Sequence, residues 1–384
     1  MSAQPPTLGV GMAGFGFIGK VHAHAYRSQR LFYDPPPALP KLVGVCTSRA
    51  ETAQRAAEQG EFEFGTDRFE DLLAREDIDV IDVATPNQLH REQVLAALEA
   101  GKHVYCDKPL AVTLEDARVM VAAARARSEL SHGMALHCRF VPATMRARQL
   151  VEAGRIGRVY HFRAAYLHSG YEDPQRPISW RLSREAGGGV LSDLGSHIID
   201  LMGWLLGPYE TVHADAETFI RERPTGAGGG ARAPVEVEDY VGFRAAMRSG
   251  ALGFIEASRF ATGAQDQLEF AIFGERGALR FDLMNPNWLL FYDAGDPAGD
   301  LGGERGFKML ECVQRYPKPS ALPSPKLGVG WIRYHLHAMH DFLAAVAEGR
   351  LGNATLLDGA RAQAVDAAVR ESLATGGRAT VADL

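Results

Sequence analysis

Short apolar runs alternate with amphipathic segments through the first third of the chain. Residues 8–13 are small or apolar without a polar side chain, which predicts a buried β-strand. Similar runs follow at 41–46, 80–84 and 103–106, and the segments between them have helical composition. This alternation predicts an α/β fold whose N-terminal domain, residues 1–135, is a doubly wound parallel sheet.

The pattern changes after residue 135. Strand-like segments follow one another at 158–168, 211–220, 235–248, 252–258, 268–273 and 278–282, with short turns between most of them. We therefore expect a C-terminal α+β domain, residues 136–384, built on a largely antiparallel sheet. We also expect a last strand of the first domain at 137–140, a glycine-rich hairpin loop or lid at 223–234, and an aperiodic segment at 285–330. Amphipathic helices are expected at 332–347 and 355–374.

A GxGxxG motif follows the first strand and begins an apolar helix. Gly14 permits a tight turn, Gly16 lets the backbone approach a pyrophosphate, and Gly19 lets helix and strand pack closely. The N–H groups at the start of the helix would face the two phosphates. This glycine-rich turn (Gly14–Gly19) therefore predicts a dinucleotide-binding Rossmann domain.

The second strand ends at Thr47-Ser48-Arg49, where a dinucleotide fold places the residue that reads the ribose. An acidic side chain there would accept hydrogen bonds from a free 2′-hydroxyl, and this chain has none. Two hydroxyls and a cation suit a 2′-phosphate instead. The prediction is a cofactor that is NADP or NAD, with NADP favoured.

Composition and charge narrow the classes of partner. The 384 residues carry a net charge of −6 and no basic block, which argues against nucleic acid. No apolar run is long enough for a membrane span, and the start, MSAQPPT, has no signal-peptide pattern. The four scattered cysteines (Cys46, Cys106, Cys138 and Cys312) indicate buried thiols in a cytoplasmic protein.

Histidines near the C-terminus do not predict a metal site. His335, His337 and His340 lie in one helical segment, but positions i and i+2 of a helix face different sides. His335 and His337 therefore cannot easily share an ion, and we expect no metal.

Four segments together resemble the Gfo/Idh/MocA oxidoreductases: AGFGFIGKVHAHAY, ATPNQLH, GKHVYCDKP and GGGVLSDLGSHIIDL. In that family the lysine of a Glu-Lys-Pro element is catalytic, and Lys108 matches it, although Asp107 stands where the glutamate usually does. The family's DxxxH pair is also catalytic, and it matches Asp193 and His197, which lie i, i+4 on one helix face. The expected cofactor-binding residues are Gly14, Gly16, Phe17, Ile18, Gly19, Thr47, Ser48, Arg49, Thr85, Pro86, Asn87, His90, Asp107 and Lys108.

These residues suit the oxidation of a secondary alcohol by hydride transfer to a nicotinamide. A neutral His197 can accept the alcohol proton, and Lys108 can stabilise charge on the reacting oxygen. The reverse assignment also stays open, because a buried lysine can have a lowered pKa. Asp193 can hold His197 or accept a neighbouring substrate hydroxyl.

The resemblance implies a sugar, anhydro-sugar or cyclitol as substrate. The segments ISWR, EVEDY and GALGFIEASR resemble a branch of the family that acts on anhydro-sugars and glycosides. Arg139, His168, Trp180 and Arg181 are the candidate substrate-binding residues, and Trp180 could stack on a sugar face or serve as a core tryptophan. Three alternatives remain: a glycosidase that oxidises its substrate transiently with NAD, a cofactor-sensing regulator without turnover, and a non-enzymatic scaffold, for which no sequence feature argues. A second copy of the chain is expected to cover an open sheet face, giving a homodimer or homotetramer.

Overall fold

The computed structural model describes residues 4–226 and 230–384, and its contacts divide the chain into two compact units. Unit 1 comprises Met1–Phe140 and Tyr316–Ala360, and unit 2 comprises Val141–Arg315 and Arg361–Leu384. The sequence pattern placed Tyr316–Ala360 in the second domain. Its contacts assign it to unit 1, because the apolar side chains of α8 (Trp331–Glu348) pack against α1 (Phe17–Phe32).

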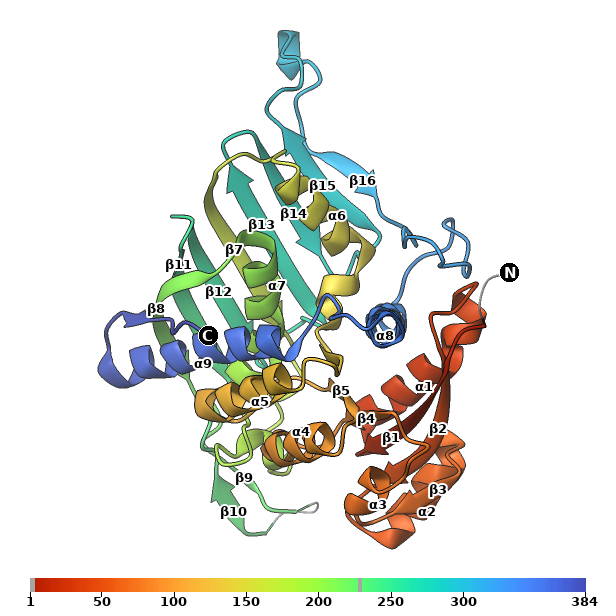
Figure 1. Ribbon diagram of the computed structural model, residues 1–384. Coiled ribbons are helices and arrows are strands. Elements are labelled where there is room, and N and C mark those ends of the chain that lie inside the picture. The colour runs from red at the N-terminus through yellow and green to blue at the C-terminus, as the bar shows by residue number, and fades with distance from the viewer. Residues whose placement is uncertain (1–3, 227–229) are drawn as a thin grey trace. The chain divides into compact units, whose positions relative to one another are not determined.

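Within the described residues, unit 1 contains a six-stranded sheet in which all neighbouring strands are parallel (Figure 1). The strand order is β3-β2-β1-β4-β5-β6, so the order reverses between β1 and β4, as in a Rossmann fold. The strands are β1 (Thr7–Ala13), β2 (Leu39–Cys46), β3 (Phe64–Thr66), β4 (Val80–Val83), β5 (His103–Cys106) and β6 (His132–Met134). The other helices of this unit are α2 (Ala50–Gly60), α3 (Glu70–Leu73), α4 (His90–Glu99) and α5 (Leu114–Ala126).

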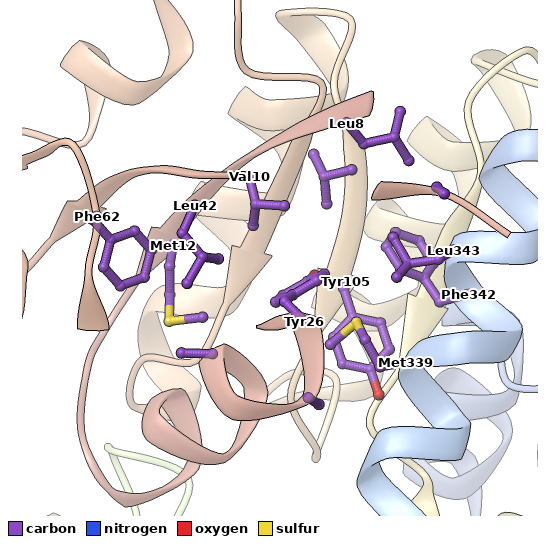
Figure 2. Close-up of a cluster of buried hydrophobic side chains, with 14 of the residues drawn as sticks. Leu8, Val10, Met12, Tyr26, Leu42, Phe62, Tyr105, Met339, Phe342 and Leu343 are labelled. Atoms are coloured by element: carbon purple, nitrogen blue, oxygen red, sulfur yellow. The ribbon is translucent and has the colours of Figure 1, made fainter. Parts of the chain in front are cut away.

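The core of unit 1 joins the sheet to helices from both ends of the chain. Val10 and Met12 of β1 are fully buried, and Tyr26 of α1 packs in the same cluster (Figure 2). Met339 and Leu343 of α8 complete that cluster from the C-terminal segment. Burying α8 in this way removes its apolar face from water, which explains why a segment so distant in sequence belongs to this unit.

Unit 2 is built on a mixed sheet. Nine strands within the described residues follow the order β16-β15-β14-β13-β7-β12-β11-β8-β17, and every neighbouring pair except β12 and β7 is antiparallel. The expected α+β domain on a largely antiparallel sheet is confirmed. The strands are β7 (Val159–Leu167), β8 (Tyr209–Glu217), β11 (Tyr240–Met247), β12 (Leu252–Ser258), β13 (Gln267–Gly274), β14 (Gly277–Asp282), β15 (Trp288–Asp293), β16 (Lys308–Glu311) and β17 (Ala379–Thr380).

Helices cover one face of this sheet. Phe162, Phe243 and Ile255 point to that face and are at most 1% exposed. α6 (Pro142–Glu152) and α7 (Ser196–Leu206) pack against it (Figure 1). α9 (Leu356–Thr375) begins in unit 1 and continues into unit 2. None of the helices within the described ranges is both long and apolar enough to cross a membrane.

Two predicted elements are wrong. His137–Phe140 is a 3-10 helix (η2) and not a strand, because the chain turns immediately after β6, where the Leu136 N–H donates to the Met134 carbonyl at 2.8 Å. The segment 285–330 is not without regular structure, since β15 and β16 lie in it. β15 pairs with β14, and β16 pairs with β15, so each strand finds its hydrogen-bond partner on a neighbouring strand, which no local pattern reveals.

The glycine-rich stretch forms a hairpin. β9 (Glu222–Pro224) pairs antiparallel with β10 (Arg232–Pro234). The tip of the predicted lid, residues 227–229, lies outside the described residues.

Candidate functional site

The glycine-rich turn joins β1 to α1 in unit 1. Gly14 has a φ of 91°, and a Cβ there would lie 2.5 Å from the carbonyl oxygen of Ala84, at the end of β4. A Cβ on Gly19 would lie 2.5 Å from the Gly14 carbonyl oxygen. Both positions therefore require glycine, one for its backbone conformation and contact and the other for close helix packing.

Gly16 differs from its two neighbours in the motif. It is the N-cap of α1, and no other atom lies within 4 Å of where its Cβ would be. The space above this residue is open, while the turn beneath it is tightly packed. An open cradle at the N-terminus of a helix fits the pyrophosphate of a dinucleotide.

The carboxyl ends of four strands of unit 1 carry the predicted cofactor residues. Gly14 follows β1, Thr47 follows β2, Thr85 follows shortly after β4, and Lys108 follows shortly after β5. Because these strands are parallel and adjacent, the four positions lie at one edge of one sheet. Ser48 and Arg49 are exposed there, and Lys108 and Asp107 are half-buried.

His90 contacts both the loop after β4 and the loop after β5. Its Nδ1 lies 2.9 Å from the carbonyl oxygen of Pro109, and its Nε2 lies 2.9 Å from the carbonyl oxygen of Thr85. The Thr85 hydroxyl donates to Gln93 at 2.7 Å. His90 is buried, so we expect it to support these loops rather than to present its ring to a ligand.

An aromatic contact beside the glycine-rich turn was not predicted from the sequence. Phe17, the first residue of α1, is 73% exposed and stacks on Trp331 with ring centroids 5.6 Å apart. Trp331 begins α8 and packs against His335 in turn. Phe17 was expected at the cofactor, but Trp331 lies far along the chain, and no motif marks it.

The predicted catalytic pair lies in unit 2 at a change of helix type. Asp193 belongs to a π-helical turn (η4, Leu191–Gly195), and His197 lies in the first turn of α7. π-Helical turns are rare and frequently occur at functional sites. The expected helix is present, but its first turn is wider than the i, i+4 argument assumed.

A buried arginine that sequence reasoning missed binds Asp193. Nη2 of Arg259 lies 2.8 Å from Oδ2 of Asp193, and the arginine side chain is 2% exposed while the aspartate is 28% exposed. The carboxylate of Asp193 thus contacts a buried cation, while part of the side chain remains exposed to solvent. His197 is buried, and its ring packs edge-on against Tyr166 at 5.8 Å.

A second carboxylate extends this site within unit 2. The Tyr166 hydroxyl donates to Oδ1 of Asp266 at 2.6 Å, and Nε2 of His168 lies 3.0 Å from the same oxygen. The predicted residue His168 and the unpredicted Asp266 are each about one-third exposed. A carboxylate accepts hydrogen bonds, so the exposed part of Asp266 can bind hydroxyl groups.

The remaining substrate candidates lie in different surroundings. The Arg181 guanidinium lies over the Trp180 ring at 4.5 Å, in a 3-10 helix (η3, Trp180–Leu182) of unit 2.

Arg139 belongs to unit 1 and is 5% exposed, with Nη1 donating to the Asn353 carbonyl at 2.6 Å and Nη2 lying 3.3 Å from Asp358. Burial alone would raise the pKa of Asp358, but Arg139 and hydrogen bonds from Thr355 hold it below its ordinary value. Arg139 therefore binds groups of unit 1, and its contact with substrate stays a prediction.

The cysteines are buried thiols, as expected. Burial, together with nearby carboxylates, raises the pKa of Cys46 to about 11, and burial raises the pKa of Cys312 to about 11 as well. Both thiols stay protonated near neutral pH, so they are poor nucleophiles.

Comparisons with known proteins match both halves of the chain. Residues 8–133 match the oxidoreductase family with an NAD-binding Rossmann fold, and residues 144–280 match the GFO/IDH/MocA C-terminal domain. Levoglucosan dehydrogenase of Pseudarthrobacter phenanthrenivorans is 36% identical over 380 residues, which is 96% of each chain. The 1,5-anhydro-D-fructose reductase of Ensifer adhaerens is 41% identical over 167 residues, covering 43% of this chain and 49% of that protein.

Solved structures agree with these matches. Levoglucosan dehydrogenase in complex with NADH and levoglucosan superposes with a TM-score of 0.93 at 36% identity, over 98% of this chain and all of that chain. An NAD-binding oxidoreductase from Klebsiella pneumoniae superposes with a TM-score of 0.91 at 31% identity, with the same coverage. With its open cradle for a pyrophosphate and matches on both units, the chain belongs to the Gfo/Idh/MocA family of oxidoreductases with an NAD-binding Rossmann fold.

Proposed function

We propose that the protein oxidises a secondary hydroxyl of a sugar or anhydro-sugar with NAD as hydride acceptor. The observation that carries the substrate class is the similarity to levoglucosan dehydrogenase along nearly the whole chain. The partial match to 1,5-anhydro-D-fructose reductase supports the same class. The proposal extends to cyclitols, which also present ring hydroxyls.

The glycine-rich turn and the strand ends of unit 1 would hold the cofactor. When bound, the nicotinamide supplies the carbon that takes up hydride. The α1 N–H groups at Gly16, Phe17 and Ile18 would bind the pyrophosphate, and the residues after β2 would bind the adenosine ribose.

Lys108, Asp193 and His197 are the proposed catalytic residues. His197 accepts the proton of the alcohol, and Lys108 hydrogen-bonds the reacting oxygen and stabilises its negative charge. Asp193 is the fixed anion of the site, since its carboxylate is paired with Arg259. Of the two roles that the sequence left open for Asp193, its partial exposure favours contact with a substrate hydroxyl.

A panel of sugars and cyclitols, levoglucosan included, tests the reaction with NAD and with NADP by following the absorbance of the reduced nicotinamide. Steady formation of NADH supports the proposal. Cofactor that stays bound without net NADH formation, while a glycoside is cleaved, would indicate the glycosidase alternative. Sugar-dependent changes in cofactor binding without any turnover would indicate the regulator.

Lys108→Ala and His197→Ala test the catalytic assignment. Removing the base should lower kcat by about 10²–10⁴ with cofactor affinity retained. Lys102→Ala is a matched control, because Lys102 lies before β5 and donates to the carbonyls of Arg75 and Ile78 at 2.9 and 2.8 Å. If Lys108 and His197 act together on one substrate, the effects of removing them should not multiply. The kcat of the double variant should then lie within a few-fold of the kcat of the slower single variant. Unchanged kcat in both single variants would overturn the assignment.

The pH dependence of kcat separates the two possible bases. With His197 as base, activity should fall at acidic pH, because only the neutral imidazole can accept the alcohol proton. That acidic limb should vanish from the residual activity of His197→Ala. If the limb persists in this variant and vanishes in Lys108→Ala, the lysine is the base.

We further propose that Arg49 allows the protein to use NADP. Arg49 is the exposed N-cap of α2, and its carbonyl accepts a hydrogen bond from the Thr52 hydroxyl at 2.8 Å. The Thr47 hydroxyl lies 2.6 Å from that of Thr52, so these hydroxyls hold the loop while the guanidinium extends from it. One charge-assisted hydrogen bond to a 2′-phosphate would contribute about 1.5–3 kcal/mol.

Arg49→Glu tests this preference. The Kd for NADP should rise at least tenfold, while the Kd for NAD changes little. Arg55→Glu makes the same change in charge further along α2 and should leave the ratio of the two affinities unchanged. An equal effect of both variants on NADP would show only a general electrostatic effect.

We also propose that a second copy of the chain covers the face of the unit 2 sheet opposite α6 and α7. Leu252 and Phe254 on β12 point to this face and are 61% and 41% exposed. Light scattering at micromolar concentration should give a dimer or tetramer, and Phe254→Asp should shift it toward the monomer. A wild-type monomer would overturn this proposal.

A further inference from the structure

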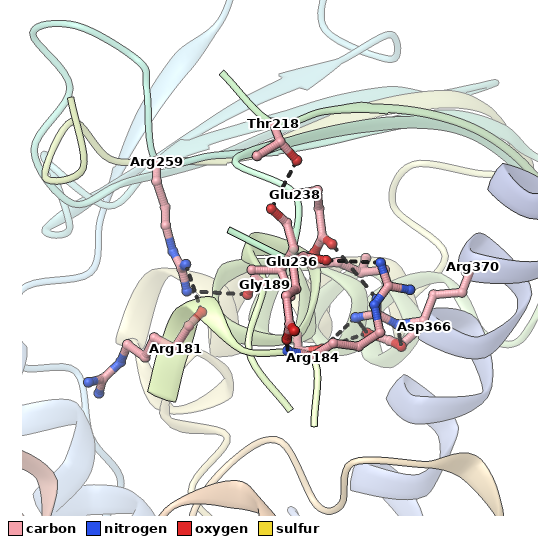
Figure 3. A network of polar contacts seen from close by, with 12 residues as sticks. Arg181, Arg184, Gly189, Thr218, Glu236, Glu238, Arg259, Asp366 and Arg370 are labelled. Carbon is pink, nitrogen blue, oxygen red and sulfur yellow. Dashed lines mark hydrogen bonds and ion pairs between the residues drawn. The ribbon is translucent and has the colours of Figure 1, made fainter. Parts of the chain in front are cut away.

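Three consecutive residues of the π-helical turn are held by four side chains of unit 2. The Leu191 N–H donates to Oε1 of Glu238 at 3.0 Å. The Ser192 hydroxyl donates to Asp366 at 3.0 Å and accepts from Arg370 at 2.9 Å. The Asp193 carboxylate binds Arg259. The turn is therefore fixed by Arg259 just after β12, by Asp366 and Arg370 of α9, and by Glu238 before β11. Figure 3 labels these four side chains.

Arg259 is the member of this set that reaches the proposed site. It follows β12, and its guanidinium donates through Nη2 to the Gly189 carbonyl at 3.2 Å and through Nη1 to the Arg181 carbonyl at 3.4 Å. Both contacts are drawn in Figure 3. The Asp193 N–H donates to the same Gly189 carbonyl at 3.1 Å. One buried side chain thus binds both ends of the Gly189–Asp193 segment.

The same guanidinium also contacts the loop before η3. It lies 4.6 Å from the centre of the Tyr171 ring, and the Tyr171 N–H donates to the Arg259 carbonyl at 3.4 Å. Arg181 follows Trp180, a candidate sugar-stacking residue. Arg259 therefore contacts both Asp193 and residues at the two ends of the segment 171–181.

We propose that Arg259 is a positioning residue for the oxidation: it fixes the Asp193 carboxylate and sets its place relative to the loop that carries Trp180. The planar guanidinium suits this task, because its donors can bind a carboxylate and two carbonyls at once. Lysine would keep the charge but lose the fixed geometry. This inference rests on the proposed function, because it assigns Arg259 to that reaction.

Arg223 offers a matched control. It is also buried, at 0% exposure, and donates to the carbonyls of Asp173 and Tyr171 at 2.8 and 2.6 Å. Its guanidinium lies 5.8 Å from the same Tyr171 ring. It therefore supports the same loop as Arg259, but these two hydrogen bonds go to loop carbonyls rather than to the Asp193 carboxylate.

A double-mutant cycle between Arg259→Met and Asp193→Asn tests the proposal, with kcat, the KM of the sugar and the NAD affinity measured for each variant. Levoglucosan is the first probe, and the best substrate of the panel replaces it if it reacts faster. Arg259→Met should lower kcat about 10- to 100-fold, since a small misplacement of a reacting group has effects of this size. NAD affinity should stay within twofold, because the glycine-rich turn belongs to unit 1.

The coupling between the two residues is the decisive result. In the Asp193→Asn background, Arg259→Met should reduce kcat by less than threefold, whereas Arg223→Met should have the same effect in both backgrounds. Arg259→Lys should recover part of the lost kcat. If Arg259→Met lowers kcat by the same factor in Asp193→Asn as in the parent, the positioning role is wrong. The proposed function would still stand.

Failure of the proposed function looks different. An unchanged kcat in Asp193→Asn would remove Asp193 from the reaction, whatever Arg259 does. If Arg259→Met does not fold, as judged from its melting curve, the same cycle is measured with Arg259→Lys, which retains the buried charge. Equal kcat for Arg259→Lys and the parent would then also count against the proposal.

Discussion

Nδ1 of His22 lies 3.0 Å from Oδ1 of Asp82, and the two side chains are 1% and 0% exposed inside unit 1. Burial alone would lower the pKa of His22, but the carboxylate of Asp82, which also hydrogen-bonds the ring, raises it above its ordinary value. The pair joins α1, which contains Gly19, to β4, which is followed by the Ala84 carbonyl that lies against Gly14. A buried ion pair thus connects the helix and the strand on either side of the dinucleotide cradle.

Breaking this pair should destabilise the protein more than replacing it. His22→Leu or Asp82→Asn leaves one buried polar partner behind and should cost about 3–5 kcal/mol in the free energy of unfolding. The double variant His22→Leu/Asp82→Leu should cost less than the sum of the two single changes. Urea unfolding measures all three, and strictly additive losses would show that the two groups do not depend on each other.

Gly16→Ala and Gly19→Ala should separate cofactor binding from folding. The methyl group added by Gly19→Ala would meet the Gly14 carbonyl oxygen. This variant should therefore have a lower melting temperature and a weaker affinity for NADH than the parent. The methyl group added by Gly16→Ala would meet no atom within 4 Å beyond residue 16 and its two chain neighbours, so this variant should keep the melting temperature. Its NADH affinity should still fall at least tenfold, because the methyl group would occupy the cradle. NADH fluorescence titration and thermal melts measure the two effects, and normal NADH affinity in Gly16→Ala would contradict the proposed pyrophosphate position.

Trp331 should report on bound cofactor. Its ring stacks on Phe17 beside Gly16, so energy transfer from tryptophan to bound NADH should fall strongly in Trp331→Leu. Loss of an aromatic contact of about 0.5–1.5 kcal/mol predicts a NADH affinity weaker by up to about tenfold. Trp288→Leu, on β15 of unit 2, is the control for the loss of a tryptophan. Energy transfer that depends on Trp288 rather than Trp331 would place the nicotinamide elsewhere.

Acid should destabilise unit 1 through two histidines of α8. Burial, and then nearby Arg333, lowers the pKa of His340 to about 4, and burial with His340 and Arg333 nearby lowers that of His337 well below its ordinary value. The His340 ring stacks on Tyr33 with centroids 3.6 Å apart, and Nδ1 of His337 lies 2.8 Å from the Tyr33 hydroxyl. Both rings are therefore buried in the neutral form.

The sign of this effect follows from proton binding. Between pH 6.5 and about 4 the unfolded chain binds more protons at His340 than the folded chain does. The contribution of His340 to the free energy of unfolding is therefore fully present above pH 6.5, and it falls as pH drops through this window. The slope should reach about 1.4 kcal/mol per pH unit for each such histidine. His340→Gln should flatten the dependence of the unfolding free energy on pH in this window. A slope unchanged by the substitution would assign acid sensitivity to other groups.

Local sequence patterns were sufficient for most of the parallel sheet of unit 1. The GxGxxG spacing, the apolar run before it and the alternation of strand and helix are features of consecutive residues, so they predicted β1, α1, β4 and β5 closely. The positions after these strands could then be placed at one edge, because parallel strands share their direction. The antiparallel character of the second sheet followed from short turns between successive strands in the same way.

Contacts between distant segments could not be predicted in this way. The apolar face of α8 is visible in the sequence, but nothing in it says that this face packs on α1 some 300 residues earlier. β15 acquires its hydrogen bonds from β14 and β16, and β16 acquires its own from β15. The expected strand at 137–140 is a 3-10 helix, because the chain turns directly after β6.

The proposed active-site pair shows the same division. Asp193 and His197 were predicted from the motif that contains them and its resemblance to the family, but the π-helical turn that holds Asp193 was not expected. Arg259 lies 66 residues from Asp193 and could not be recognised as its partner. Folding brings β12 against the π-helical turn, and only there does a buried guanidinium need a carboxylate to offset the cost of leaving water.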